Sequence, residues 1–319
     1  MKYMNNKLKI HLLVNETAGN GHAKSVFEQT TALLINDNIN FDTRKSDYAG
    51  EAIRIAQDYG NRPHSSNEIL LVIGGDGSLN EVLNGIKRSS NPATPIAYLP
   101  AGTGNDFGRA ACLTADPKIL LDRLKSRVKP DQIDCGSFVF PDINKDKKYY
   151  FANSFGVGFD AFVNHNSNIS KLKKLLNRFN EGKLIYGYNV LASVTRQDTF
   201  SVDIETNKRK VHFDDAFLVT TTNHPYLGGG LPLLPSAKIN SHKIDTVVVE
   251  KFGLRKLVKL FINLLKDGSH VYDPQFHYFE AKKITVKTRQ KEYAQVDGEE
   301  IKRNTFNVEF FVSSFNLLR

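Results

Sequence analysis

The chain has 319 residues, of which 40% are hydrophobic and 24% charged, and its formal net charge is +9. This composition lies near the average for globular proteins, which excludes a mainly disordered, collagen-like or coiled-coil chain. At roughly 150 residues per domain, the length predicts two domains. The charge is uneven, since residues 1–160 hold 19 basic and 18 acidic side chains, whereas residues 161–319 hold 24 and 16. The basic second half indicates an anionic partner there, either nucleic acid or a membrane surface.

Cysteine usage and the lengths of the apolar runs bear on the compartment. Cys112 and Cys135 are the only cysteines, and their spacing fits neither a disulfide framework nor a CxxC pair. They predict a reducing, cytoplasmic setting. The first 15 residues lack the apolar core of a signal peptide, and apolar runs such as 69–73 are far shorter than the roughly 20 residues that cross a bilayer. We therefore expect no membrane-spanning segment.

In the first half, apolar runs of strand length alternate with helical patterns. We expect a helix after Ser78, with this serine as its N-cap. The other expected elements are strands at 9–14, 39–44, 69–73 and 95–99 and helices at 25–36 and 50–59. This alternation predicts an α/β domain with a mostly parallel sheet, whose functional residues gather at the carboxyl ends of the strands.

After about residue 134 the pattern changes to strands with few helices between them. Strands are expected at 148–154, 200–205, 216–222, 246–250, 283–288 and 306–312, and helices at 169–196 and 254–266. This half predicts a mainly antiparallel β domain. We place the two domains at 1–133 and 134–312, and residues from about 313 to 319 could return to the first domain.

Three glycine-rich turns follow three of the first-half strands, at 15–21 (NETAGNG), 74–78 (GGDGS) and 100–106 (PAGTGND). Each places glycines where a strand ends and a helix begins, so bare backbone N–H groups can face an anion. In any single turn the glycines could simply permit tight turning, but three turns on one sheet edge favour a phosphate site. Asp76 and Asp106 lie inside two of the turns. A carboxylate beside a phosphate is favourable only with a cation between them, which indicates a nucleotide bound with Mg²⁺.

Other nucleotide-binding patterns are missing from the sequence. It has no GxxxxGK[ST], no HRD or DFG set, and no GxGxxG after the first strand. P-loop proteins, protein kinases and dinucleotide-binding folds are therefore disfavoured. A phosphoryl-transfer fold built around GGDG remains.

The motifs carry a family resemblance. Residues 74–81 (GGDGSLNE) resemble the GGDGTxxE motif of the diacylglycerol kinase catalytic domain, residues 100–110 (PAGTGNDFGRA) resemble its PxGTxNDFAR segment, and residues 15–19 resemble its NPxxG. Residues 296–299 (VDGE) are similar to its late DGE motif. GGDG alone is shared with NAD kinases and phosphofructokinases, whereas GTGNDF with a late DGE is more specific. Nearly the whole chain is similar to the soluble bacterial lipid kinases of this family, and more distantly to sphingosine and ceramide kinases.

The resemblance implies an ATP-dependent lipid kinase, with an NAD-kinase- or phosphofructokinase-like α/β domain, a β-sandwich on the lipid side and the site in the cleft. It implies that Asp76 and Asp106 organise the catalytic Mg²⁺ and that Glu299 accepts the proton of the lipid hydroxyl, with Asp297 as a further catalytic candidate. The alternative for the last two is an exposed hairpin turn. Nucleotide-binding positions are expected at Asn15, Thr17, Gly19, Ser46, Gly74, Gly75, Gly77, Ser78, Glu81, Gly102, Thr103 and Asn105.

Apart from Ser78, which replaces the threonine of GGDGT and keeps a hydroxyl, the sequence departs from the family pattern in two places. Glu16 replaces the proline of the first motif and brings a negative charge toward the phosphates. In residues 235–245 (PSAKINSHKID), the aspartate that binds a structural Mg²⁺ in the family falls on Ser241, and the glycine falls on His242. A serine hydroxyl is a poor ligand for a hard cation compared with a carboxylate. We therefore expect that this chain has lost the structural metal.

Two segments combine cations with apolar residues, at 171–179 (KLKKLLNRF) and 251–266 (KFGLRKLVKLFINLLK). Such helices suit an anionic bilayer surface. The alternative is a helix that packs its apolar stripe on the β domain, with its cations in water. One of Lys171, Lys173 and Lys174 could instead reach the phosphates. Because nothing resembles an aromatic platform for nucleic acid, we expect peripheral contact with an anionic membrane and no nucleic acid. A homodimer stays open.

The leading hypothesis is an enzyme that transfers phosphate from ATP to the hydroxyl of a membrane lipid, most simply diacylglycerol giving phosphatidate. Two alternatives stay open, an enzyme like NAD kinase and a non-catalytic regulator that binds nucleotide or membrane. The sequence does not identify the lipid.

Overall fold

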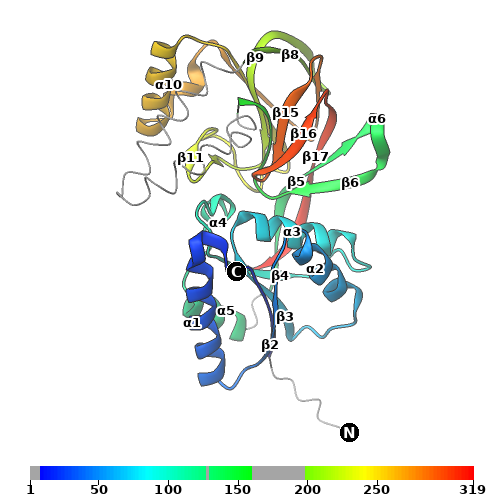
Figure 1. The fold of residues 1–319 in the computed structure, drawn as a ribbon, viewed down its shortest axis with the longest axis vertical. Coiled ribbons are helices and arrows are strands. Elements are labelled where there is room, and N and C mark those ends of the chain that lie inside the picture. Colours follow the sequence, from blue (N-terminus) through cyan, green and yellow to red (C-terminus); the bar gives the residue numbers. More distant parts are fainter. Residues whose placement is uncertain (1–7, 127–128, 160–197) are drawn as a thin grey trace.

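The computed structural model describes residues 8–126, 129–159 and 198–319. The chain forms two lobes, an α/β lobe from the first half of the sequence and a strand-rich lobe from the second half (Figure 1). The helix expected at 169–196, with Lys171, Lys173 and Lys174, lies outside the described residues. The first basic segment, 171–179, lies outside them as well, and the lobes are described below without these residues.

Four parallel strands form the centre of the first lobe, in the order β2-β1-β3-β4. Successive β1 residues point to opposite faces, so Leu12 packs with α1 and α5, whereas Leu13 packs with α2 and α3. Helices cover both faces, which explains why β1 and β3 are almost continuously apolar. The elements are β1 Lys9–Val14, η1 Ala18–Gly21, α1 His22–Asn36, β2 Asn40–Lys45, α2 Glu51–Asn61, β3 Glu68–Gly74, α3 Asp76–Arg88, β4 Ile96–Pro100, α4 Asp106–Ala110 and α5 Pro117–Lys125.

The strands and helices predicted for this half are present, with ends shifted by a few residues, but the predicted N-cap is wrong. Helix α3 begins at Asp76, and its N-cap is Gly75, which is extended with φ −91° and ψ −173°. Ser78 lies inside the helix. A Cβ atom on Gly74 would be 2.4 Å from the Ser78 Oγ, so this hydroxyl packs back on the end of β3. The absence of a side chain at Gly74 lets the helix start earlier than the serine suggested.

The second lobe is built from antiparallel strands, as predicted. Strand β9 pairs with β7, β8 and β12, and the lobe's core is rich in phenylalanine. The sequence patterns missed β5, β7, β10, β11, β13, β15 and β16, and the strand expected at 148–154 corresponds to β6 and ends where β7 begins. The elements are β5 Asp131–Phe140, α6 Pro141–Asn144, β6 Lys145–Phe151, β7 Ser154–Gly158, β8 Phe200–Thr206, β9 Lys210–Thr222, β10 Tyr226–Leu227, β11 Leu231–Pro232, β12 Ile244–Glu250, α10 Leu254–Lys266, η3 Ser269–Tyr272, β13 Phe276–Ala281, β14 Lys283–Thr288, β15 Glu292–Val296, β16 Glu299–Asn304 and β17 Asn307–Leu318.

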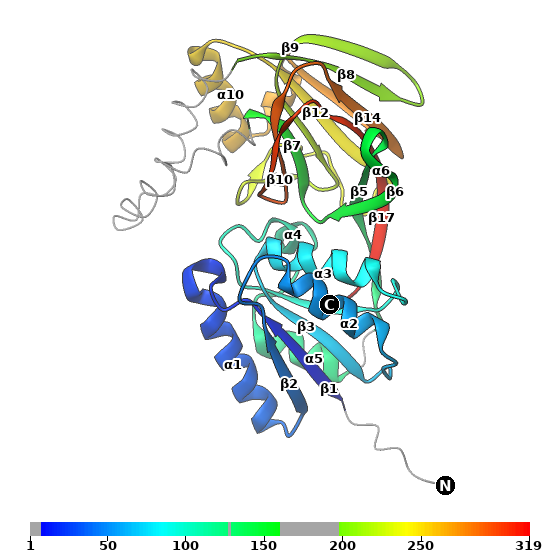
Figure 2. The ribbon, with the colours of Figure 1, turned by 45° about the vertical axis from the view of Figure 1, so that its right-hand side comes forward.

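The last strand, β17, belongs to both lobes. Its first part pairs antiparallel with β14, and it runs beside β5 from Glu309 to Leu317. Its end then pairs in parallel with β4, Leu317 opposite Ile96, so the C-terminus lies in the first lobe (Figure 1). Strand β10 of the second lobe also contacts α4 of the first, and Figure 2 shows the two facing each other across the junction. These contacts fix β16, which directly precedes β17, relative to the loops of the first lobe.

Candidate active site at the junction of the lobes

The three glycine-rich loops meet at the carboxyl ends of β1, β3 and β4. A Cβ atom on Gly102 would lie 2.5 Å from the Cα of Gly75, and one on Gly19 would lie 2.4 Å from the carbonyl oxygen of Ala101. Gly19 also has a φ of 63°, which residues with a side chain rarely adopt. These three glycines therefore allow the loops to contact one another. A role in binding phosphate would come in addition to that packing role.

Two asparagines shape the same loops through their side chains. The Asn15 Oδ1 accepts hydrogen bonds from the Thr17 backbone N–H at 3.2 Å and the Thr17 hydroxyl at 2.8 Å. Asn105, with a φ of 52°, accepts from the Gly102 N–H at 2.9 Å and donates to the Gly102 carbonyl at 3.0 Å. Both carbonyl oxygens are thus used inside their own loops. The loops are preorganised by these bonds before any ligand binds.

The two predicted acidic residues, Asp76 and Asp106, lie together. Both Asp76 oxygens accept bonds at 3.2 Å from the first N–H groups of α4, those of Asp106 and Phe107. The Asp106 carboxylate contacts the Arg109 guanidinium at 3.0 Å and accepts from the Gly229 N–H at 2.9 Å. Burial, and then the Asp106 charge, raise the pKa of Asp76. The pair therefore concentrates negative charge that Arg109 offsets only in part.

This pair fits a Mg²⁺ ion that arrives with a nucleotide. Mg²⁺ in kinase sites takes one or two carboxylates and completes its shell with phosphate oxygens and water. Among the described residues, no group of three or more His, Cys, Asp and Glu side chains could hold a metal ion. Burial is the main cause of the raised pKa of Asp76, and the Asp106 charge adds a repulsion that a cation would relieve. The donor set thus suits an open site shared with a substrate.

A cavity of about 330 Å³ opens between the loops after β1, β2 and β3 and the start of β16. Eight predicted residues line it, namely Asn15, Thr17, Ser46, Gly75, Gly77, Ser78, Glu81 and Glu299. The other predicted residues lie outside its lining, namely Asp76, Asp106, Asp297, Gly19, Gly74, Gly102, Thr103 and Asn105. Glu299 is the lining residue from the second lobe. The cavity therefore brings a carboxylate of one lobe to the glycine-rich loops of the other.

The loop after β2 contributes lining residues that sequence reasoning missed, Asp47, Tyr48 and Ala49. Glu81 holds this loop in place, because its two carboxylate oxygens accept from the N–H groups of Gly50 at 2.8 Å and Ala52 at 3.0 Å. Tyr48 is 63% exposed beside the cavity. No motif marks this loop, and its position after a parallel strand was the one available signal.

Asp297 and Gly298 form a two-residue turn between β15 and β16, in which Val296 pairs with Glu299. The φ values of 48° and 89° are those of the tight turns that suit hairpins. The hairpin turn that the sequence offered as the alternative interpretation is therefore present, and it also directs Glu299 to the cavity. Partial burial of the carboxyl, and then the nearby Glu81 charge, raise the pKa of Glu299. A raised pKa strengthens a carboxylate as a proton acceptor.

The Asp297 carboxylate accepts four hydrogen bonds from within the protein. Its donors are the Asn80 amide at 2.7 Å and the N–H groups of Ala152 at 2.7 Å, Asn153 at 2.9 Å and Ser154 at 2.8 Å. Burial raises the pKa of Asp297 to about 6, against the opposite effect of these donors. Because Asn80 belongs to α3, the carboxylate joins the hairpin to the first lobe.

The first departure from the family pattern is compensated locally. The Glu16 carboxylate lies 2.9 Å from the Lys45 ammonium at the end of β2. The negative charge that replaces the family proline therefore has a cation beside it.

The second departure keeps the backbone shape and changes the ligands. His242 has a φ of 56°, the left-handed conformation that the family glycine supplies at no cost. Its N–H and its Nδ1 bond the Asp134 carboxylate at 2.7 and 3.1 Å. The Ser241 hydroxyl accepts from the Lys243 N–H at 3.3 Å. An imidazole therefore sits on Asp134 next to the position where the family carries its metal-binding aspartate.

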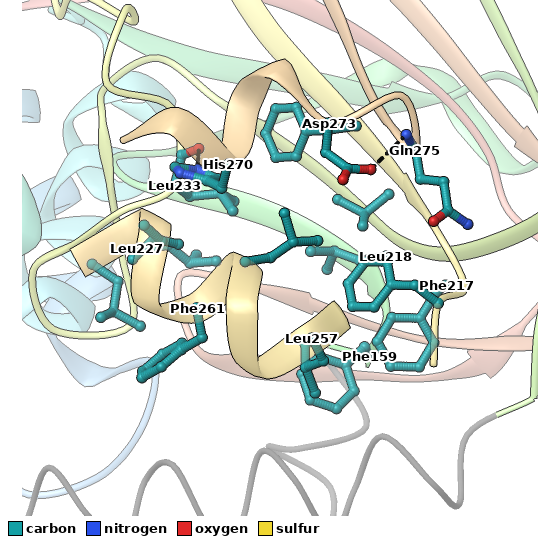
Figure 3. Close-up of a pocket in the computed structure, with 16 residues that line it drawn as sticks. Phe159, Phe217, Leu218, Leu227, Leu233, Leu257, Phe261, His270, Asp273 and Gln275 are labelled. Carbon is teal, nitrogen blue, oxygen red and sulfur yellow. Dashed lines mark hydrogen bonds between the residues drawn. The ribbon is translucent and has the colours of Figure 1, made fainter. Parts of the chain in front are cut away.

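An apolar pocket of about 150 Å³ lies in the second lobe beneath α10. Leu257 and Phe261 of α10 face Phe217 and Leu218 of β9 across it (Figure 3). Leu227 and Leu231 line it from the short β10–β11 hairpin. The intervening glycine Gly229 is the one that donates to Asp106. A single tight loop thus connects the apolar pocket with the acidic pair.

None of the helices in the described ranges is long and apolar enough to span a bilayer.

The comparisons with known proteins agree with this arrangement. Residues 9–138 match the family model "Diacylglycerol kinase catalytic domain", and residues 153–319 match the model "YegS C-terminal NAD kinase beta sandwich-like domain". The chain is 30% identical over 302 residues to a diacylglycerol kinase of Staphylococcus saprophyticus, covering 91% of this chain and 88% of the relative. It is 30% identical over 319 residues to a diacylglycerol kinase of Staphylococcus epidermidis, covering 96% and 92%.

Two solved structures share the fold. A diacylglycerol kinase from Bacillus anthracis superposes with a TM-score of 0.64 at 21% identity, covering 97% of this chain and 96% of that one. Yeast NADH kinase superposes with a TM-score of 0.53 at 14% identity, covering 98% and 84%. The predicted fold class, a mostly parallel α/β domain followed by an antiparallel β-sandwich, is confirmed. On both its family models and its sequence relatives, the chain belongs to the diacylglycerol kinase family of lipid kinases.

Proposed function

We propose that this protein transfers the γ-phosphate of ATP to the hydroxyl of a membrane lipid, with diacylglycerol as the acceptor and phosphatidate as the product. The observation that carries the proposal is the position of Glu299, a second-lobe carboxylate that lines a cavity otherwise formed by first-lobe residues, including those of two glycine-rich loops. The printed names of the relatives, diacylglycerol kinases, support the choice of acceptor.

The first lobe would bind the nucleotide. The cavity offers neutral polar groups from Asn15, Thr17 and Ser46 and bare backbone at Gly75 and Gly77, which suit phosphate oxygens. Asp76 and Asp106 would hold Mg²⁺, which would supply positive charge to neutralise the charge that develops on the phosphates in the transition state. Arg109, which contacts Asp106 at 3.0 Å, keeps that carboxylate in place. Preorganised loops lower the entropic cost of placing the nucleotide.

Glu299 would accept the proton of the attacking lipid hydroxyl. In a loose transition state the hydroxyl loses its proton late, so a positioned carboxylate with a raised pKa is a suitable acceptor. Asp297, whose oxygens all serve internal bonds, would position the hairpin that carries Glu299 and would not itself exchange protons with a substrate.

The second lobe would hold the lipid. The apolar pocket beneath α10 suits part of an acyl chain, since its lining is almost entirely leucine, phenylalanine and valine. The β10–β11 hairpin would set the distance between the acyl chain and the reacting hydroxyl, because Leu227 and Leu231 line the pocket while Gly229 bonds Asp106.

Radiolabelled ATP offered with a panel of acceptors tests the proposal. The panel contains diacylglycerol, ceramide, sphingosine and NAD, with and without Mg²⁺. We expect label in phosphatidate, dependent on Mg²⁺, and a loss of about 10²–10⁴-fold in kcat for Glu299→Gln with an unchanged Tm. Label in the phosphorylated form of NAD would replace the proposal with the NAD kinase hypothesis. Tight nucleotide binding without transfer to any acceptor would favour a regulator, and full activity of Glu299→Gln would remove the assigned base.

A further inference from the structure

Helix α10 carries apolar residues on two adjacent faces. Leu257, Leu260, Phe261 and Leu264 face inward and line the apolar pocket. A second set points outward, with Val258 42%, Ile262 55% and Leu265 58% exposed. Their spacing of four and three residues places them on one stripe of the helix. Val258 and Leu265 therefore lie on a different face of the helix from the pocket-lining Leu257.

Cations lie along the far side of this exposed stripe. Residues 251–266 contain five basic and no acidic residues. Lys256 bonds Asp273 at 2.7 Å, but Arg255, Lys259 and Lys266 are exposed and make no ion pair with any residue in the described ranges. Around the helix, the order is pocket-lining face, exposed apolar stripe and cationic stripe. Tyr272, 85% exposed, follows on the turn η3 that contacts the end of α10.

We propose that the outer stripe of α10, Val258, Ile262 and Leu265, inserts into the surface of an anionic bilayer while Arg255, Lys259 and Lys266 bind the lipid headgroups. An exposed apolar stripe flanked by unpaired cations is the arrangement of helices that lie in a membrane interface. A tyrosine at the end of the stripe suits the headgroup level, where an aromatic body and a polar hydroxyl are both accommodated. Charge complementarity selects the anionic bilayer over a second copy of this basic chain.

This surface gives the helix two tasks, on adjacent faces. Its inner face covers the apolar pocket (Figure 3), and its exposed apolar stripe would meet the bilayer. Where the lipid substrate of the proposed function is bound, a single helix would separate the acyl-chain pocket from the membrane that supplies the lipid. The bilayer contact itself does not depend on that function, because it can be measured without ATP or substrate.

The test is binding of the full chain to vesicles of phosphatidylcholine, alone or in equal amounts with phosphatidylglycerol. We expect binding to the mixed vesicles that weakens with salt. The triple variant Val258→Gln, Ile262→Gln, Leu265→Gln should bind at least about tenfold more weakly. The triple variant Arg255→Gln, Lys259→Gln, Lys266→Gln should bind mixed vesicles about 10²-fold more weakly, since each cation near an anionic surface contributes to the binding free energy. Its binding to vesicles of phosphatidylcholine alone should not change. Both variants should keep the parent Tm, because the changed side chains are exposed.

A matched control removes three exposed isoleucines elsewhere, Ile35→Gln, Ile119→Gln and Ile143→Gln, which are 66%, 45% and 75% exposed. This variant should bind vesicles as the parent does. Equal losses in the control and the apolar triple variant would overturn the proposal, and so would parent protein that binds neither vesicle. Light scattering measures the oligomeric state of the same proteins. If the parent were a dimer that bound no vesicles, and the apolar triple variant were a monomer, the stripe would belong to the interface with a second copy of the chain. Vesicle binding without lipid phosphorylation would leave this inference intact and overturn the proposed function alone.

Discussion

The two sides of the junction are built in different ways. On the first-lobe side, the loops after β1, β3 and β4 are held by short-range bonds, such as Asn105 to Gly102 three residues away. On the second-lobe side, the residues that face the junction are placed by bonds between distant parts of the chain, such as Asp297 to Asn80 and Gly229 to Asp106. The loops of the first side are therefore shaped mainly by bonds within each loop, whereas the residues of the second side are placed by contacts between distant parts of the chain.

This difference assigns different effects to the two sides. A change in the local loops should alter the chemistry with every acceptor while the fold stays intact. A change in the long-range bonds should alter the placement of Glu299 or of the lipid, together with the stability of the junction. The predictions below separate these two outcomes.

The largest expected effect is on the first-lobe side, at Asp76. We expect Asp76→Asn to lower kcat about 10³-fold with any acceptor, because a neutral amide is a weaker ligand for Mg²⁺ than a carboxylate and does not balance the charge of the cation. Its Tm should fall only slightly, because the amide loses one of the two N–H bonds that the Asp76 carboxylate accepts from α4 while removal of the negative charge favours the fold. A carboxyl whose pKa is raised by folding stabilises the fold only while protonated, and this contribution is lost as the pH rises through the folded pKa. At pH 7.5 the ionised side chain therefore costs stability that the amide recovers. A large fall in Tm would show that Asp76 serves the fold, contrary to this assignment.

The second prediction concerns Asp297, where stability and turnover should change together. Asp297→Asn places an amide NH2 group against N–H donors, so we expect a loss of about 2–4 kcal/mol in the free energy of unfolding, measured in urea. Asn80→Ala removes one of the four donors and should cost about 1 kcal/mol. Turnover should fall in both variants, and it should fall more in Asp297→Asn, the less stable of the two. If Asp297→Asn kept the parent stability and lost turnover as fully as Glu299→Gln, Asp297 would be a catalytic residue.

The same difference explains what could be predicted from the sequence. Strands β1 and β3 are buried on both faces, so their apolar runs are unmistakable, and the turns that follow them carry their glycines and aspartates in one short stretch. Strand β16 reads EEIKRN and has no buried residue pattern, because it lies at the end of the sheet order beside β15. Its presence depends on the hairpin turn and on pairing with β15, which no local pattern reports.

Candidate site residues follow the same rule. Glu299 could be named because a DGE motif is short, but the partners of Asp297 lie 143 or more residues away and could not be. The cation beside Glu16 depends likewise on a contact between distant residues, with Lys45. The early start of α3 depends instead on a local contact, between Gly74 and Ser78. Tyr48 had no motif at all, and it became a candidate only when the loop after β2 was seen beside the cavity.

The third prediction uses Tyr48 to sharpen the assignment of the cavity to a nucleotide. An exposed aromatic ring beside the cavity can stack on the adenine base, which typically contributes about 1–3 kcal/mol per base. Tyr48→Ala should raise the KM for ATP about tenfold with kcat nearly unchanged, whereas Tyr48→Phe, which keeps the ring, should behave as the parent. Equal KM values for all three chains would remove the base from this end of the cavity.

The smallest expected effect is at Ser241 and His242, the second-lobe positions where the family pattern has an aspartate and a glycine. The parent's Tm should be the same in Mg²⁺ and in chelator. Because His242 already adopts the left-handed conformation, His242→Gly keeps the turn and removes the imidazole from Asp134. Combined with Ser241→Asp, it places a second carboxylate near Asp134, and two carboxylates with backbone oxygens suit Mg²⁺. At a Mg²⁺ concentration ten times the Kd, the double variant should gain about 1.4 kcal/mol, seen as a rise of about 3 °C in Tm that chelator abolishes. If the Tm of the parent chain itself rose with Mg²⁺ alone, the serine and histidine would not have displaced the metal. This part of the second lobe would then bind Mg²⁺ through oxygens other than the missing carboxylate.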